Sequence, residues 1–111
     1  MRELDLHYPT CPIRNVLSRF SDKWSLLILV NLQGKEKMRY KELMAAIPDI
    51  SQKMLSSTLK QLEADHFILR EAYAEIPPRV EYSLTETGKT LIPVLNMMID
   101  WSLVHFEEVT K

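Results

Sequence analysis

Cationic and short hydroxyl side chains recur along residues 52–65 at a spacing suited to binding nucleic acid. Leu55, Leu59 and Leu62 are in helical register, which predicts a helix that turns this apolar face inward. The opposite face then carries two lysines and two serines: Lys53, Ser56, Ser57 and Lys60. Long cations suit phosphates and short hydroxyls suit base edges, so the pattern favours contact with a groove of double-stranded DNA. A solvated polar face is the plainer interpretation of the same residues.

Further candidate DNA contacts flank this helix. Ser51 is a typical N-cap, and Gln52 in the first turn could reach a base edge. Arg39 and Lys41 stand at the start of the preceding helix and would bind phosphates, which position a protein on DNA without reading its sequence.

Arg79 follows Pro77 and Pro78 at the expected tip of a β-hairpin. A stiff turn that presents one arginine suits the minor groove or its phosphates. The same arginine could instead pair with Glu75 or Glu81 on its own hairpin. The sequence favours neither interpretation over the other.

Cys11 is the chain's one cysteine and precedes Pro12 at the start of a predicted helix. Unpaired N–H groups at a helix N-terminus stabilise a thiolate, and Arg14 lies one turn further on. One cysteine cannot form an internal disulfide, so oxidation would give a bond between subunits, a mixed disulfide or an electrophile adduct. The alternative is an inert, part-buried side chain.

Composition limits the class of protein. The 111 residues suit one domain, and a formal net charge of −1 excludes a uniformly basic coat. Residues 35–60 nevertheless carry six basic side chains against three acidic ones. The lone cysteine, the absence of an apolar leader and short apolar runs predict a cytoplasmic protein without a membrane partner. No phosphate loop, nucleophile motif or metal-ligand spacing is visible, so we expect neither an enzyme nor a metal or other cofactor.

Apolar periodicity and capping residues predict a mostly α fold with one β-hairpin. The expected elements are helices over 12–20 and from Asp22 to Gly34, a helix-turn-helix over about 39–65, strands over 67–75 and 80–84, and a helix over 86–107. In the second helix we expect Trp24, Leu27, Ile28 and Leu32 to point inward. In the last helix, Pro93 makes a kink or marks the true start. Two helices followed by a hairpin predict a winged helix-turn-helix, in which the hairpin at about 67–84 is the wing. We expect residues 1–111 to form one such domain.

These segments resemble the HxlR-type family of small bacterial winged-helix transcription regulators. The resemblance extends from Cys11 to Trp101 and rests on CPI at 11–13, KWSLLIL at 23–29, RYKEL at 39–43, ISQKMLSSTLKQLEAD at 50–65 and PPRVEYSLTETGKTLIPVL at 77–95. It implies a recognition helix and wing that bind DNA, and a dimer joined by the N- and C-terminal helices. Several members are similar in placing a sensing cysteine at the position of Cys11. The chain departs from the family pattern at His66 and Asp49, where glycine is common.

The last helix has apolar residues on more than one face, which favours burial against a partner chain. With the resemblance, this predicts a homodimer interface that includes Ile13, Leu17, Leu95, Met98 and Trp101. The expected function is a dimeric transcription regulator that binds a near-palindromic operator and responds to thiol-reactive stress through Cys11. The alternatives are a regulator that senses a hydrophobic small molecule and a protein-interaction module that binds no DNA.

Overall fold

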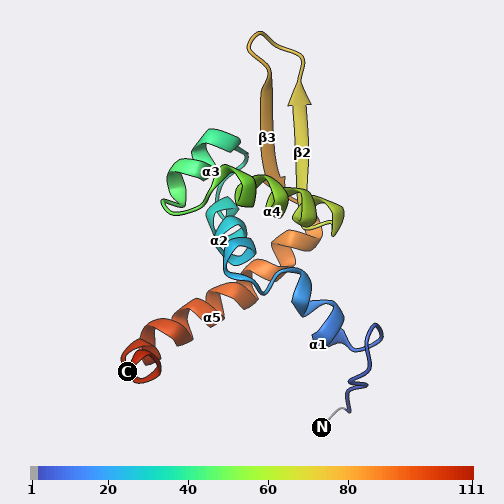
Figure 1. Cartoon of the computed structure of the whole chain (residues 1–111), viewed down its shortest axis with the longest axis vertical. Coiled ribbons are helices and arrows are strands. Elements are labelled where there is room, and N and C mark those ends of the chain that lie inside the picture. Colours follow the sequence, from blue (N-terminus) through green and yellow to red (C-terminus); the bar gives the residue numbers. More distant parts are fainter. Residues whose placement is uncertain (1–2) are drawn as a thin grey trace.

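A computed structural model describes residues 3–111 as a helical body with a β-hairpin projecting at one end and two helical segments at the other (Figure 1). The elements are α1 (Pro12–Asn15), the 3-10 turn η1 (Leu17–Arg19), α2 (Lys23–Leu32), β1 (Met38–Arg39), α3 (Tyr40–Ala46), α4 (Gln52–Ala64), β2 (Ile68–Tyr73), β3 (Arg79–Leu84) and α5 (Glu86–Thr110). The predicted fold class, a winged helix-turn-helix with an extra N-terminal helix and a long C-terminal helix, is confirmed.

The first predicted helix is interrupted. Its α-helical part ends at Asn15, and the chain tightens into η1 before Phe20. No residue of α1 or η1 is buried, so little packing supports a longer helix here. Phe20 is buried, and its ring meets that of Phe67 edge-on at 5.6 Å between centroids.

Helix α2 is capped as expected but turns a different face inward. The Asp22 carboxylate accepts from the Ser25 N–H at 2.9 Å and from the Ser25 hydroxyl at 2.7 Å. The buried side chains are Ser25, Ile28, Leu29 and Leu32, so the prediction that Leu27 points inward is wrong and Trp24 is only half-buried. Because almost every position of this helix is apolar, periodicity alone did not mark the buried face.

The helix-turn-helix is formed by α3 and α4. Ile47 and Ile50 are buried in the turn between them, and the Ser51 hydroxyl accepts from the Met54 N–H at 3.0 Å. Leu55, Leu59 and Leu62 are buried as predicted. Thr58 joins them on the inward face.

The three strands form an antiparallel sheet in the order β1-β3-β2. Met38 pairs with Tyr82, Ile68 with Leu84, and Tyr73 with Arg79. The sheet's lower part covers the core, and the hairpin of β2 and β3, the wing, extends beyond the helices (Figure 1).

Helix α5 begins at Glu86 and continues through Pro93, so the prediction that Pro93 could mark its start is wrong. Its buried stripe is short, comprising Gly88, Ile92 and Leu95. The later turns extend away from the body (Figure 1). The radius of gyration, 15.9 Å, accordingly exceeds the roughly 13 Å of a compact domain near this size.

Candidate nucleic-acid interface

The outer face of α4 carries the side chains expected there. Lys53, Ser57 and Lys60 are exposed. Ser56 is half-buried, and its hydroxyl lies 3.1 Å from that of Tyr40, which also donates to the Gln52 carbonyl at 3.1 Å. Ser56 therefore joins the two helices of the motif besides lining the outer face.

Further residues predicted to contact DNA lie at the start of α4 and at the start of α3. The Ser51 hydroxyl is engaged as the N-cap of α4, and Gln52 is exposed. Arg39 is the N-cap residue of α3, where its N–H donates to the Glu42 carboxylate at 2.8 Å, and Lys41 is exposed.

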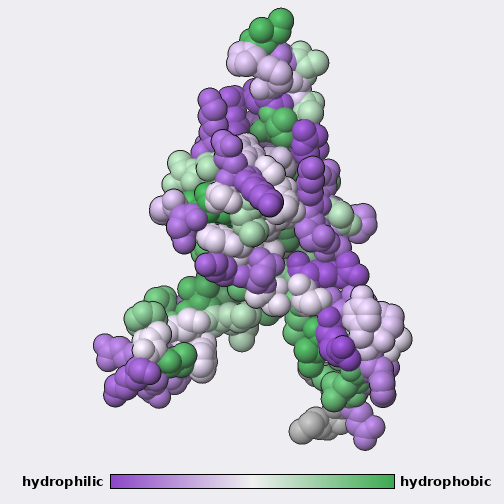
Figure 2. Space-filling model, viewed as in Figure 1, coloured by the Kyte–Doolittle hydropathy of each residue, from purple (hydrophilic) through white to green (hydrophobic). Residues whose placement is uncertain are grey.

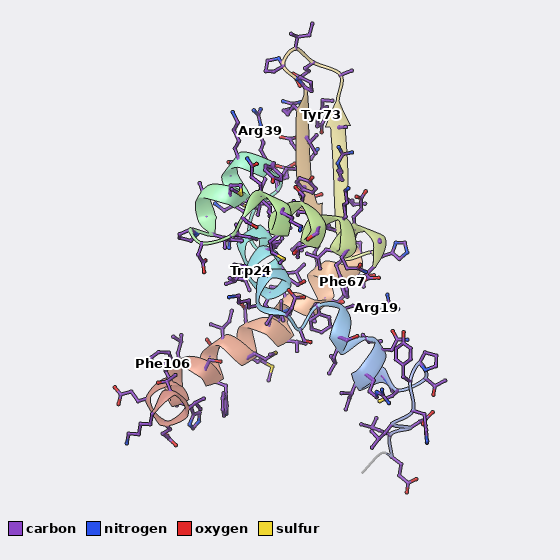
Figure 3. The ribbon with its side chains drawn as sticks, in the orientation of Figure 1. Arg19, Trp24, Arg39, Phe67, Tyr73 and Phe106 are labelled. Atoms are coloured by element: carbon purple, nitrogen blue, oxygen red, sulfur yellow. The ribbon has the colours of Figure 1, made fainter. Side chains whose placement is uncertain are left out.

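The side chain of Arg39 lies beside the wing that carries Tyr73 (Figure 3), in agreement with the pairing of β1 and β3. A notch of about 400 Å³ separates the start of α3 from the wing tip. Arg39, Lys41 and Arg79 all line it, so three of the predicted phosphate contacts meet at one place.

Arg79 is paired within the wing. Its guanidinium lies 4.1 Å from the ring centroid of Tyr73, and its Nε is 3.0 Å from a Glu75 carboxylate oxygen. That distance makes an ion pair, although Nε has no hydrogen-bond partner among the described residues. Of the two interpretations left open by the sequence, the structure shows pairing with Glu75 in the free protein. Ile76, at the tip, is fully exposed.

A second polar network fixes the wing to the start of β1. The Lys37 ammonium donates to the Tyr73 hydroxyl at 2.8 Å and to Glu71 at 3.2 Å, and the Tyr73 hydroxyl donates to Glu71 at 3.0 Å. The hydrogen bonds with Tyr73 and Glu71 raise the pKa of Lys37 above its ordinary value. The bonds from Lys37 and then Tyr73 lower the pKa of Glu71.

The cations thus separate into two groups. Within residues 3–111, four Arg or Lys side chains form ion pairs: Arg19, Lys37, Arg79 and Lys89. Nine others form none there. Four of these are Arg14, Lys23, Lys35 and Lys111, and the other five lie on β1, α3, α4 and the wing: Arg39, Lys41, Lys53, Lys60 and Arg70. These elements are neighbours in the fold (Figure 1), so they offer a local concentration of unneutralised positive charge.

Arg70 is the member of this group that the sequence analysis did not identify. It lies on β2 opposite Tyr82 and lines a second notch, of about 330 Å³, between α4 and the wing. Strand alternation was the available signal, because Arg70 follows Ile68 by two residues and so shares the face turned toward the helices.

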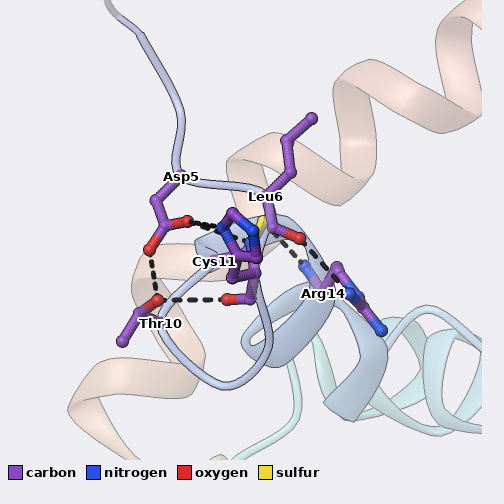
Figure 4. Close-up of polar contacts among 6 residues, drawn as sticks. Asp5, Leu6, Thr10, Cys11 and Arg14 are labelled. Atoms are coloured by element: carbon purple, nitrogen blue, oxygen red, sulfur yellow. Dashed lines mark hydrogen bonds and ion pairs between the residues drawn. The ribbon is translucent and has the colours of Figure 1, made fainter.

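Cys11 occupies the predicted helix start but is fully buried (Figure 4). Its sulfur accepts from the Arg14 N–H at 3.5 Å. The Arg14 guanidinium donates instead to the Leu6 carbonyl at 3.3 Å, so it does not reinforce a thiolate as expected. Helix α1 has only four residues, which limits the dipole at its N-terminus.

The segment before Cys11 is folded back by hydrogen bonds (Figure 4). The Asp5 carboxylate accepts from the hydroxyl of Thr10 and from the N–H of His7, the latter at 3.0 Å. These bonds, first that of Thr10, lower the pKa of Asp5. Asn15 donates to the Pro9 carbonyl at 2.8 Å and ties the segment to α1.

Exposed apolar side chains gather on both projecting segments, the one around α1 and the end of α5 (Figure 2). Four of the predicted interface residues are exposed: Ile13, Leu17, Met98 and Trp101, the last by 58%. Leu95 is only 1% exposed and belongs to the core of the chain, so it offers no surface to a partner. Between α2 and α5, an apolar groove of about 240 Å³ is lined by Leu26, Val30 and residues as far as Phe106.

None of the helices that the structure describes is long and apolar enough to cross a membrane. Over the same residues, no three His, Cys, Asp or Glu side chains gather as metal ligands would.

Known proteins share this sequence and fold. The family model described as HxlR-like helix-turn-helix matches residues 19–110. An HTH-type transcriptional regulator of Methanothermobacter thermautotrophicus is 41% identical over 95 residues, which are 86% of this chain and 72% of that protein. The redox regulator HypR in its reduced form has a TM-score of 0.82 at 35% identity, over 89% of this chain and 97% of HypR. Diamide-treated YodB from B. subtilis has a TM-score of 0.68 at 35% identity, over 88% of this chain and 94% of YodB.

Proposed function

The chain belongs to the HxlR-like helix-turn-helix family, and from this premise we propose that it acts as a homodimer that binds a near-palindromic operator in double-stranded DNA. It is a transcriptional regulator with a winged helix-turn-helix fold. DNA binding, dimerisation and the response to thiol-reactive compounds are the parts that we propose.

The observation that carries DNA binding is the distribution of unpaired cations. Arg39, Lys41, Lys53, Lys60 and Arg70 are five of the nine cations that form no ion pair within residues 3–111, and they lie on the elements that a winged helix uses against DNA. The four paired cations belong to other surfaces or to the wing's own network. Unneutralised cations gain more from phosphates than cations already held by carboxylates, because no existing ion pair must be broken. The polar outer face of α4 suits the major groove.

Dimerisation is supported by apolar surface that the chain does not cover itself. Val94, Met97, Trp101 and Val104 recur every three to four residues and form one stripe along α5, while Leu103 and Phe106 lie on another face, and all six are at least half exposed. A helix with apolar side chains on more than one face needs burial on more than one face. A second copy of the same surface supplies it with two-fold symmetry, and the two recognition helices would then meet half-sites about 10–10.5 base pairs apart or a multiple of this.

A thiol response is proposed through Cys11. HypR is a redox regulator, and YodB was solved after diamide treatment. Cys11 lies at the start of one of the two projecting apolar segments, so a covalent change there would alter the proposed dimer surface. Because the sulfur is buried, it must first become accessible, and we propose that the adjoining segment over residues 5–10 moves aside to expose it.

A second candidate effector is an apolar small molecule. A groove of about 800 Å³ lies where the base of the wing meets the start of α5, within the size range of ligand sites. Leu69, Leu84 and Ile92 form part of its lining, and Leu69, the second residue of β2, is half exposed. A molecule bound there would contact the wing and the dimer helix together.

The proposal is tested by selecting genomic fragments bound by the protein, with and without diamide. We expect selected fragments to share a palindromic site, affinity to fall linearly with the logarithm of salt concentration, and sedimentation to show a dimer at micromolar concentration. A monomer that binds no fragment at low salt would overturn the proposal in favour of a protein-interaction module.

A further inference from the structure

Arg70 is the one cation of the wing that faces the recognition helix. It lies on the same side of β2 as Ile68, which is buried in the core, and opposite Tyr82, which is 8% exposed. This side of the sheet packs on α4. On this face of β2, Arg70 is the first exposed residue after the buried Ile68, so its side chain lies at the edge of the contact between the sheet and α4.

Arg70 and Lys60 line the same notch from two different elements. The notch measures about 330 Å³, and its other lining residues are Ser56, Leu59, Glu63 and Tyr82. Lys60 is on the outer face of α4, and Arg70 reaches the notch from the wing. Two cations therefore flank a space that opens to solvent between the recognition helix and the wing.

The charge of this notch is not neutralised. Over residues 3–111, no carboxylate forms an ion pair with Arg70 or Lys60. Glu63 is the one acidic side chain in the lining, so the notch carries a net positive charge. The opposite face of the wing differs, because Lys37 is held there by Glu71, and Arg79 by Glu75. Free positive charge on the wing is thus confined to the side of α4.

We propose that Arg70 and Lys60 form a binding site for one backbone phosphate of DNA, at the junction of recognition helix and wing. The planar guanidinium supplies paired donors for phosphate oxygens, and the lysine ammonium adds a second charge from the other wall. Such a contact fixes how deeply α4 enters the major groove without reading a base. Glu63 opposes the phosphate and limits the affinity of the site. This inference rests on the proposed DNA binding.

The test compares DNA affinity over a range of NaCl concentrations for wild type, Arg70→Gln and Lys89→Gln. Lys89 is an exposed cation on α5, so its variant has the same net charge as Arg70→Gln but leaves the notch intact. Fluorescence anisotropy is measured on a selected fragment and on DNA of unrelated sequence. We expect Arg70→Gln to weaken binding to both by about tenfold at low salt and to reduce the salt slope by about one. Lys89→Gln should match wild type.

Two further variants make the outcome specific. Arg70→Lys keeps the charge and should retain the slope while losing part of the affinity, and Glu63→Gln should tighten binding to both DNAs. Thermal melting of each variant checks folding. An Arg70→Gln protein that matches Lys89→Gln, or that weakens binding to the selected fragment alone, would overturn the phosphate site. If wild type itself binds neither DNA, the proposed function fails instead.

Discussion

The carbonyl oxygen of Phe67 occupies the space that a side chain at position 88 would need. A Cβ placed on Gly88 would lie 2.2 Å from that oxygen, far inside van der Waals contact. Thr85 holds the two segments in this position, because its N–H donates to the Phe67 carbonyl at 3.1 Å and its hydroxyl accepts from the Gly88 N–H at 2.9 Å. The start of α5 is thus attached directly to the residues that follow α4.

Gly88→Ala should therefore destabilise the protein by about 1–3 kcal/mol, because Phe67 can move only with its backbone. In an open helix position the same change stabilises by up to about 1 kcal/mol, so the sign of the effect is diagnostic. Urea unfolding at one fixed protein concentration measures it, since a dimer's stability depends on concentration. Thr87→Ala, at an exposed neighbouring position, should change the free energy of unfolding by no more than about 0.5 kcal/mol.

His66 ends the recognition helix in a left-handed conformation, with φ at +67°. Its N–H donates to the Glu63 carbonyl at 3.0 Å, and that of Phe67 donates to the Leu62 carbonyl at 2.9 Å, which is the pattern of a Schellman motif. A histidine there bears steric strain that glycine avoids. His66→Gly should raise the free energy of unfolding by about 0.5–1 kcal/mol, as measured by urea unfolding. His66→Ala keeps the strain, and an equal gain from it would disprove this explanation.

Sequence reasoning worked best where a local rule determines structure. Ser51 and Thr85 fixed two helix starts through capping, and the leucines at 55, 59 and 62 fixed a buried face. It failed where tertiary packing decides. The uniformly apolar α2 gave no unique inward face, and Leu95 was assigned to the dimer although it completes the core of its own chain. The pairing of Arg79 with Glu75 depends on the bend of the wing tip, which composition does not encode.

The exposed lysines of α4 should differ in what they contact. Lys53 is in the first turn of the recognition helix, which is the part that meets base edges in this class of motif. Lys53→Ala should weaken binding to the selected operator by about 1–3 kcal/mol and relax the preference at one base pair. Lys60→Ala should weaken binding to all sequences alike and lower the salt slope by about one. Competition assays with single-base operator variants distinguish the two results, and identical patterns for both lysines would contradict the assignment.

The network of Lys37, Glu71 and Tyr73 should make the wing's stability depend on pH. The pKa of Glu71 is lowered in the folded state, so its contribution is fully present above the ordinary glutamate value of about 4.3 and is lost as pH falls through the folded value. The pKa of Lys37 is raised, so its contribution is lost only in strong alkali. Wild type should therefore be more stable than Glu71→Gln at pH 7, and the difference should shrink toward pH 3. A difference that is independent of pH would show that the ionised carboxylate is not responsible.

Access to Cys11 should be controlled by the hydrogen bonds of Asp5. The buried sulfur of the wild-type protein should react with iodoacetamide more slowly than a free cysteine model, in contrast to an exposed thiol at a helix start. Asp5→Ala removes the bonds to Thr10 and His7 and should increase the alkylation rate at neutral pH, as followed by mass spectrometry. Glu3→Ala is the matched control, because it removes an exposed carboxylate two residues earlier.

The same variants connect access to regulation. If Cys11 is the sensing thiol, diamide should release DNA from wild type, release it sooner from Asp5→Ala, and leave the DNA complex of Cys11→Ser unchanged. The order follows because the Cys11 thiolate must first add to diamide, after which a second thiol, either Cys11 of the second subunit or an added small thiol, displaces the adduct and gives a disulfide and the reduced hydrazine. Loosening the segment over residues 5–10 speeds the first of these steps. An Asp5→Ala protein that is alkylated no faster than Glu3→Ala would show that another motion exposes the sulfur. A Cys11→Ser complex that still dissociates in diamide would place the effector site elsewhere in the molecule.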